Sequence, residues 1–90
     1  MENILKRADE IVNQRKEEKE RQYGPFNECM TRATRIYNAM AKSPIGVDDM
    51  FKALIALKLA REAYSHKEDN LLDAVAYIGA LNNFLEDINP

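Results

Sequence analysis

The sequence contains no tryptophan, a single cysteine, three glycines and three prolines among its 90 residues. Glycine and proline supply the turns of β folds, so their scarcity argues against a turn-rich β structure. The one cysteine, Cys29, cannot form an internal disulfide, which fits a reducing cytoplasm, and we interpret it as a small buried apolar residue. No apolar run approaches the roughly 20 residues that span a bilayer. The N-terminus lacks the basic-then-apolar order of a signal peptide, so we expect a cytoplasmic protein without membrane contact.

The chain also lacks an excess of charge of one sign and lacks familiar catalytic motifs. Its 13 Lys and Arg residues are balanced by 15 Asp and Glu residues, so no positive field attracts nucleic acid. No glycine-rich phosphate loop, serine-centred elbow or Cys-x-x-Cys pair occurs, and we assign no catalytic residue. His66 is the only histidine and has no cysteine near it, which argues against a zinc site.

What the sequence has in abundance is residues that favour helices. Hydrophobic residues make up 46% of the chain and charged residues 31%, a balance typical of a folded domain. Ala, Leu, Glu, Lys and Arg dominate, and these residues lose the least on entering a helix. The length allows one domain, so residues 1–90 are expected to form a single all-α domain.

Hydrophobic periodicity predicts four helices, at about residues 2–19, 25–41, 47–64 and 69–87. The apolar stripe of the first helix stops after Val12, so its second half is expected to be solvated, frayed or covered by another subunit. The third helix is apolar around most of its circumference, and we expect it to be the central, most buried helix. Short connections favour antiparallel neighbours. Residues 25–87 are therefore expected to form a compact antiparallel bundle of three core helices, to which the N-terminal helix is added.

Charged residues interrupt two of these apolar stripes. Lys58 and Arg61 lie on the apolar face of the third predicted helix. Asp73 lies on the inner face of the fourth, one turn before Tyr77, and Asp69 lies one turn earlier still. Two cations on one helix could therefore face two carboxylates on the other. This pattern fits a semi-buried ion-pair network that fixes the helix register. It also fits a polar pocket, because an arginine fork and a lysine charge are suited to binding phosphate.

Several motifs resemble those of a known family. They are, in chain order, Glu20-Arg21-Gln22-Tyr23-Gly24, Ala33-Thr34-Arg35-Ile36-Tyr37, Val47-Asp48-Asp49, Leu57-Lys58-Leu59-Ala60-Arg61 and Asp69-x-x-x-Asp73-x-x-x-Tyr77. From about Ile4 to Phe84 the chain resembles short, mostly phage and prophage proteins that are catalogued as a domain of unknown function. That family in turn resembles the all-α nucleoside triphosphate pyrophosphohydrolases of the MazG type. The resemblance implies nucleotide binding and, for a phage-encoded protein, the cytoplasm of the host cell.

The metal ligands that this resemblance implies are only partly present. MazG-type enzymes bind magnesium with Glu-x-x-Glu on one helix and Glu-x-x-Asp on the next. In this chain the only Glu-x-x-Glu is Glu17 with Glu20, and Asp69 and Asp73 are spaced by four residues rather than three. The metal cluster is therefore incomplete or rebuilt, whereas nucleotide binding remains the expectation.

The first functional hypothesis is a non-catalytic, cofactor-free protein that sequesters a phosphorylated or cyclic nucleotide. In this it would be similar in style to small phage anti-defence proteins that trap immune signals. Cations would hold phosphate, a tyrosine would stack on a base and an aspartate would read a hydroxyl. The expected ligand-binding residues are Arg21, Tyr23, Lys58, Arg61, Asp69, Asp73 and Tyr77. The half-covered first helix and the small core favour a homo-oligomer.

Two alternatives belong to different classes of protein. One is a magnesium-dependent nucleotide pyrophosphohydrolase, with metal ligands among Asp69, Asp73, Asp49 and Glu28. The other is a non-catalytic protein-interaction module, in which Lys58 and its charged neighbours only set the helix register. Magnesium-dependent turnover would identify the first alternative, and an oligomer that binds no nucleotide would identify the second. The sequence leaves all three readings open.

Overall fold

The computed structural model describes residues 3–14 and 25–88, and every regular element in these ranges is helical. The elements are α1 (Ile4–Asp9), the π-helical turn η1 (Glu10–Gln14) that continues it, α3 (Phe26–Met40), α4 (Val47–Tyr64) and α5 (Glu68–Ile88). The all-α class predicted from composition is therefore confirmed. Within the described residues no helix is both long enough and apolar enough to cross a membrane.

Local signals in the sequence explain where the helices begin. The Asn3 side chain caps α1 by accepting a hydrogen bond from the Leu5 amide at 2.8 Å. Pro25 precedes α3, where its missing amide proton costs nothing. At the start of α4 the Gly46 amide donates to the Asp49 carboxylate at 3.0 Å. The predicted bounds of the last three helices agree with the structure to within one residue, whereas the end of the first, at 15–19, lies outside the described residues.

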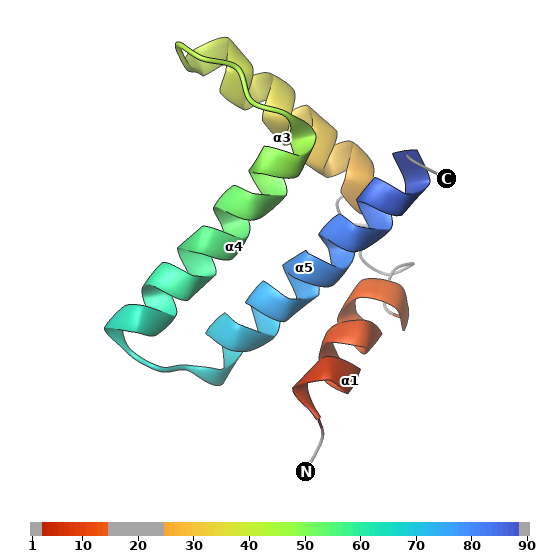
Figure 1. The fold of residues 1–90 in the computed structure, drawn as a ribbon, viewed down its shortest axis with the longest axis vertical. Helices are drawn as coiled ribbons and strands as arrows, with labels where there is room; N and C mark the ends of the chain where they lie inside the picture. Colours follow the sequence, from red (N-terminus) through yellow and green to blue (C-terminus); the bar gives the residue numbers. More distant parts are fainter. Residues whose placement is uncertain (1–2, 15–24, 89–90) are drawn as a thin grey trace.

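The helices α4 and α5 run antiparallel side by side, and α1 lies along the other side of α5 (Figure 1). Helix α3 instead crosses the end at which α4 begins and α5 ends, and its C-terminal half projects beyond them (Figure 1). The chain then returns toward α4 along α3. There the Asn38 amide group donates to the Ile45 carbonyl at 3.0 Å and accepts from its N–H at 2.8 Å. The expected compact bundle of three antiparallel helices is thus found only in part. Helices α4 and α5 are antiparallel neighbours, but α3 crosses them rather than lying along them.

The apolar core consists of two small clusters. One surrounds Leu72 where α1 meets α5, and the other surrounds Phe51 where α3, α4 and α5 meet, with Val12 packed against both. Phe51 is fully buried, with its ring edge-on to Phe26 at 5.7 Å between centroids and tilted against Phe84 at 5.5 Å. These ring contacts join three helices through one side chain.

The expectation that the third predicted helix is the most buried is wrong for the single chain. Only Phe51 is buried in α4. Helix α5 holds a larger set of buried residues, namely Asn70, Leu72, Ala74, Ala76 and Ala80. The reason is position, since α5 lies between α4 and α1, while no described residue covers the outer side of α4 (Figure 1).

Replacing Phe51 by alanine tests this account of the core. We expect Phe51→Ala to lower the free energy of unfolding by about 3–5 kcal/mol, because it removes the one aromatic ring that is fully buried among the described residues and leaves a cavity between three helices. Urea unfolding measures the loss. Ile78→Ala is the control, since Ile78 is 52% exposed and its truncation should change stability by less than about 0.5 kcal/mol. Similar losses of stability in Phe51→Ala and Ile78→Ala would contradict the central place of Phe51 in the core.

Candidate functional site

Among the described residues, the charged side chains that interrupt the apolar stripes form one ion pair between α4 and α5. Lys58 Nζ of α4 lies 3.0 Å from Asp73 Oδ2 of α5. The Lys58 side chain is 20% exposed and that of Asp73 39% exposed, so water still screens the pair in part. The lysine is thus engaged with a carboxylate and links α4 to α5.

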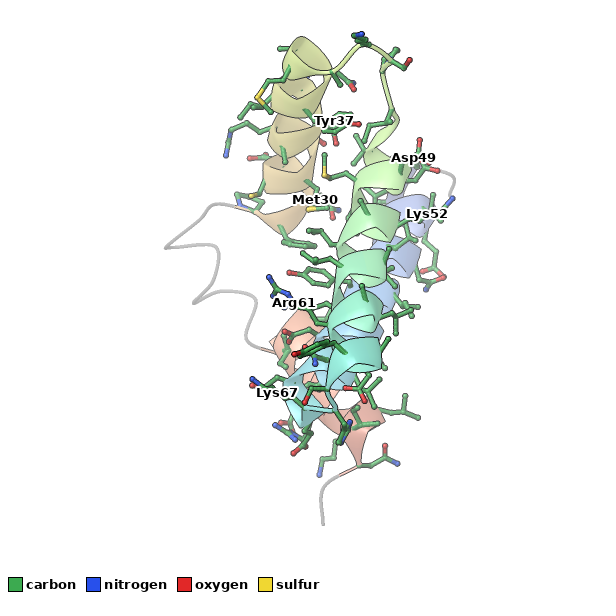
Figure 2. All side chains as sticks on the ribbon, turned by 90° about the vertical axis from the view of Figure 1, so that its left-hand side faces the viewer. Met30, Tyr37, Asp49, Lys52, Arg61 and Lys67 are labelled. Carbon is green, nitrogen blue, oxygen red and sulfur yellow. The ribbon has the colours of Figure 1, made fainter. Side chains whose placement is uncertain are left out.

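The second expected cation and carboxylate do not meet. Arg61 and Asp69 are both exposed, and neither has a hydrogen bond or ion pair with a described residue. Figure 2 shows Arg61 extending from the edge of α4. The first turn of α5 is held instead by an ion pair between Glu68 and Arg7 of α1. Sequence spacing therefore predicted one of the two pairs.

The turn between α4 and α5 is organised by Glu62. Its carboxylate accepts a hydrogen bond from the ring of His66 and another from the Lys67 amide at 3.0 Å. The hydrogen bond from His66 is the main reason that the pKa of the Glu62 carboxyl lies below its ordinary value of 4.5, and the Lys67 amide acts in the same direction. His66, for which the sequence suggested no role, is thus part of this turn.

Of the three remaining predicted site residues, one packs against a neighbouring ring and two lie outside the described part of the chain. The ring of Tyr77 stacks on that of Phe26, with centroids 6.2 Å apart and an interplanar angle of 24°. This face of Tyr77 is therefore taken by a neighbour in the protein rather than open to a base. Arg21 and Tyr23 lie outside the described residues.

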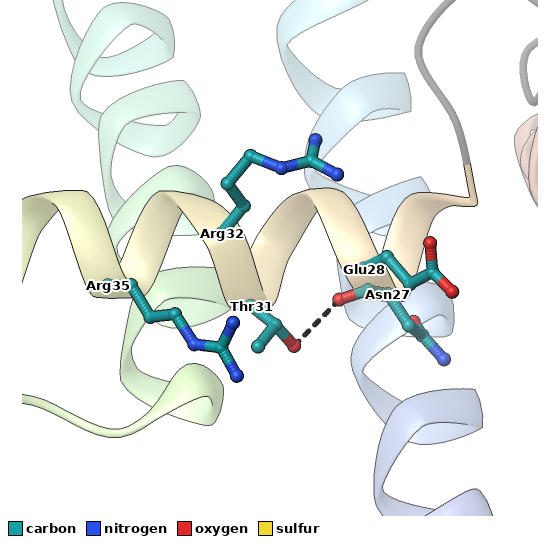
Figure 3. Close-up of a pocket in the computed structure, with 5 residues that line it drawn as sticks. All are labelled: Asn27, Glu28, Thr31, Arg32 and Arg35. Carbon is teal, nitrogen blue, oxygen red and sulfur yellow. Dashed lines mark hydrogen bonds between the residues drawn. The ribbon is translucent and has the colours of Figure 1, made fainter.

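A polar hollow of about 360 Å³ lies on α3, and none of the seven expected ligand-binding residues lines it (Figure 3). Its lining residues are Asn27, Glu28, Thr31, Arg32 and Arg35. In Figure 3 the guanidinium groups of Arg32 and Arg35 lie on either side of the helix, that of Arg35 beside the side chain of Thr31. Neither arginine has a hydrogen bond or ion pair with a described residue. Both guanidinium groups are therefore available to an anion.

The other groups of the hollow are oriented by local contacts. The Thr31 hydroxyl donates to the Asn27 carbonyl at 2.9 Å, so its oxygen remains able to accept a hydrogen bond. The Asn27 side-chain amide donates to Asp87 at the end of α5 at 3.4 Å, which ties the hollow to the helix pair. Glu28 adds a carboxylate one turn before Arg32. The hollow thus combines two cations with acceptors for hydroxyl or amino groups.

Comparison with known proteins gives one result. A family model described as a domain of unknown function (DUF6378) matches residues 3–85. The chain belongs to this family. No curated protein and no solved structure matches the chain. Both the Lys58–Asp73 pair and the hollow on α3 lie within the matched range, so both belong to the DUF6378 domain itself.

The residues considered as magnesium ligands do not come together in the described part of the DUF6378 domain. Across residues 3–14 and 25–88 no group of three or more His, Cys, Asp or Glu side chains is arranged to hold a metal ion. Asp73 is paired with Lys58, Asp49 binds the Gly46 amide, and Glu28 lines the hollow on α3. Glu17 and Glu20 lie outside the described residues. The described residues do not fit a magnesium cluster.

A double-mutant cycle measures what the Lys58–Asp73 pair contributes to the DUF6378 domain. We expect Lys58→Met and Asp73→Asn to show a coupling free energy of about 0.5–1 kcal/mol, because the pair is partly exposed. Added salt should reduce it. Urea unfolding of the wild type, the two single variants and the double variant, at low and at high salt, gives this coupling free energy. A coupling energy of zero at low salt would show that the pair does not set the register.

The pH dependence of stability tests the role of Glu62. Its folded-state pKa lies below the value of 4.5 that applies when the chain is unfolded, so the ionised carboxylate stabilises the fold above pH 4.5. That contribution is lost as the pH falls through the lowered folded-state pKa. Glu62→Gln should therefore be less stable than wild type at neutral pH and should lose less stability on acidification. Urea unfolding at a series of pH values checks this, with the exposed Glu86→Gln as control. Parallel profiles for wild type and Glu62→Gln would contradict it.

Proposed function

We propose that this DUF6378 domain binds a phosphorylated nucleotide in the hollow on α3 and holds it without chemical change. The observation that carries the proposal is the pair of unengaged arginines, Arg32 and Arg35, that line a hollow of about 360 Å³. This volume is at the lower end of the range for small-molecule sites. The proposal moves the site from the α4–α5 pair, where the sequence suggested it, to α3.

Arginine is the side chain best suited to a phosphate group. Its planar guanidinium presents a fork of donors that matches two phosphate oxygens, and it remains charged at all physiological pH values. Arg35 lies beside Thr31 in Figure 3, and Arg32 is one turn earlier on the same helix. We assign the first phosphate contact to Arg35 and a second to Arg32.

The acceptors in the hollow support a nucleotide rather than free phosphate as the ligand. Phosphate offers mainly acceptor oxygens, whereas a sugar and a base also present hydroxyl and amino donors. The oxygen of Thr31 and the carboxylate of Glu28 can accept from such donors. Glu28 also repels phosphate, so it orients the ligand with its charged end toward Arg35.

The charged residues of the helix pair have a smaller part in this proposal. Lys58 is held by Asp73 at 3.0 Å, so binding a ligand through Lys58 requires breaking that pair. Arg61 is exposed and unengaged within the described residues, and it serves as the competing site in the test. A nucleotide that is held and not converted is removed from solution, which is the sequestration described in the first functional hypothesis.

Native mass spectrometry and calorimetry with a panel of linear and cyclic nucleotides, with and without magnesium, test the proposal. We expect wild type to retain intact ligand. Arg35→Ala should weaken binding by about tenfold or more, because a hydrogen bond to a charged group contributes about 1.5–3 kcal/mol. Arg61→Ala removes the same group from a different helix and should leave affinity unchanged.

Three results would contradict the proposal. The first is a protein that binds no member of the panel. The second is loss of a pyrophosphate or phosphate mass from the ligand, which indicates hydrolysis. The third is loss of binding in Arg61→Ala with no change in Arg35→Ala, which places the site on α4. Far-UV circular dichroism of each variant confirms that the helices are retained.

A further inference from the structure

The outer side of α4 is an apolar surface that no described residue covers. Residues spaced by three and four along the helix share this side and are exposed, and they are Ala53, Ala56, Leu57, Ala60, Ala63 and Tyr64. We call this set the α4 face. Leu57 is 45% exposed and Tyr64 is 94% exposed. Between Ala53 and Tyr64 the α4 face carries no charged residue, although it points to solvent in the single chain.

Charged side chains border the α4 face along its edges and at its N-terminal end, where Asp49 lies one turn before Ala53. Figure 2 looks onto this side of the molecule, with Asp49 and Lys52 extending to one side of α4 and Arg61 to the other. An apolar centre with a charged border is the usual anatomy of a protein interface. A helix that lies on a membrane instead carries mainly Lys and Arg beside its apolar face. The acidic first turn of α4, with Asp48 and Asp49, does not fit that pattern.

We propose that the α4 face is the contact between two copies of this chain, with α4 packed against α4 of the second copy about a two-fold axis. A two-fold contact uses the same surface on both partners, so an apolar, uncharged face is complementary to itself. The alanines at three- and four-residue spacing allow two helix backbones to approach closely, and Leu57 and Tyr64 supply larger apolar contacts beside them. The proposal does not depend on the ligand of the hollow on α3.

Two exposed charges on α4 favour the antiparallel orientation. Asp49 lies one turn before Ala53, and Arg61 lies beside the other end of the α4 face. The remaining charges at both ends are mixed, since Asp48 pairs with Lys52, and Glu62, Glu68 and Asp69 accompany Arg61 and Lys67. Antiparallel packing brings Asp49 of each helix toward Arg61 of the other, and it also opposes the two helix dipoles. Parallel packing would set Asp49 against Asp49 and Arg61 against Arg61.

Analytical ultracentrifugation over a wide range of protein concentration tests the proposal on the full chain. Wild type should sediment with about twice the mass of 10.3 kDa. Ala60→Glu should weaken self-association by about a hundredfold or more, because the symmetry introduces two unpaired carboxylates at the centre of the apolar contact. Leu57→Arg introduces charge of the opposite sign and should have the same effect. Ile78→Glu places a charge on an equally exposed apolar position of α5 and should remain a dimer.

Circular dichroism separates dissociation from unfolding, since Ala60 and Leu57 are exposed in the single chain and their variants should keep full helicity. A wild-type protein that stays monomeric at all concentrations overturns the proposal, and so does an oligomer that survives both Ala60→Glu and Leu57→Arg. Loss of the dimer in Ile78→Glu alone would place the contact on α5. Binding of nucleotide by a monomeric wild type would overturn this inference while leaving the proposed function intact.

Discussion

The position of α3 depends on the packing of one ring, that of Phe51. This side chain is fully buried, and its contacts with Phe26 and Phe84 connect α4 to α3 and α5. Helix α3 crosses the other helices instead of lying along them, so this cluster is its main apolar attachment. The hollow on α3 is therefore positioned by an apolar contact on the opposite side of the same helix. The link between Asn27 and Asp87 adds a polar restraint near its first turn.

The second constraint is the small amount of apolar surface that the single chain buries. Two small clusters hold the described helices together, and several large apolar side chains on α3, α4 and α5 remain exposed. Short domains with little core commonly gain stability from association. In the arrangement proposed here, α4 is covered by α5 on one side and by a second copy on the other.

The sequence predicted the local structure well, but it predicted less well which helices and side chains lie next to one another. Helix bounds followed from hydrophobic periodicity, because this signal acts within a few residues, and the structure adds the local caps at Asn3 and Gly46. The Lys58–Asp73 pair followed from spacing, but Arg61 and Asp69 do not meet because one correct pair does not fix the directions of the next side chains. The outer position of α4 could not be inferred, since a helix that is apolar on all sides shows the same pattern whether its own chain or another copy covers it.

The hollow on α3 was missed for a related reason. Arg32 and Arg35 lie on the polar face of an amphipathic helix, where charged residues are ordinary and carry no distinct signal. Only the structure shows that they share a hollow and lack partners among the described residues. The pattern that could have indicated them is the spacing of Thr31 and Arg35 by one turn, next to Arg32.

The central claim, that α4 is completed by a second copy, is tested most directly by small-angle X-ray scattering of the wild-type protein. The radius of gyration of a single chain is 13.9 Å, calculated over its Cα atoms. The account predicts a scattering mass near twice 10.3 kDa and a radius of gyration clearly above that value. A mass of 10.3 kDa with a radius of gyration near 13.9 Å would contradict it, because the α4 face would then remain open to water.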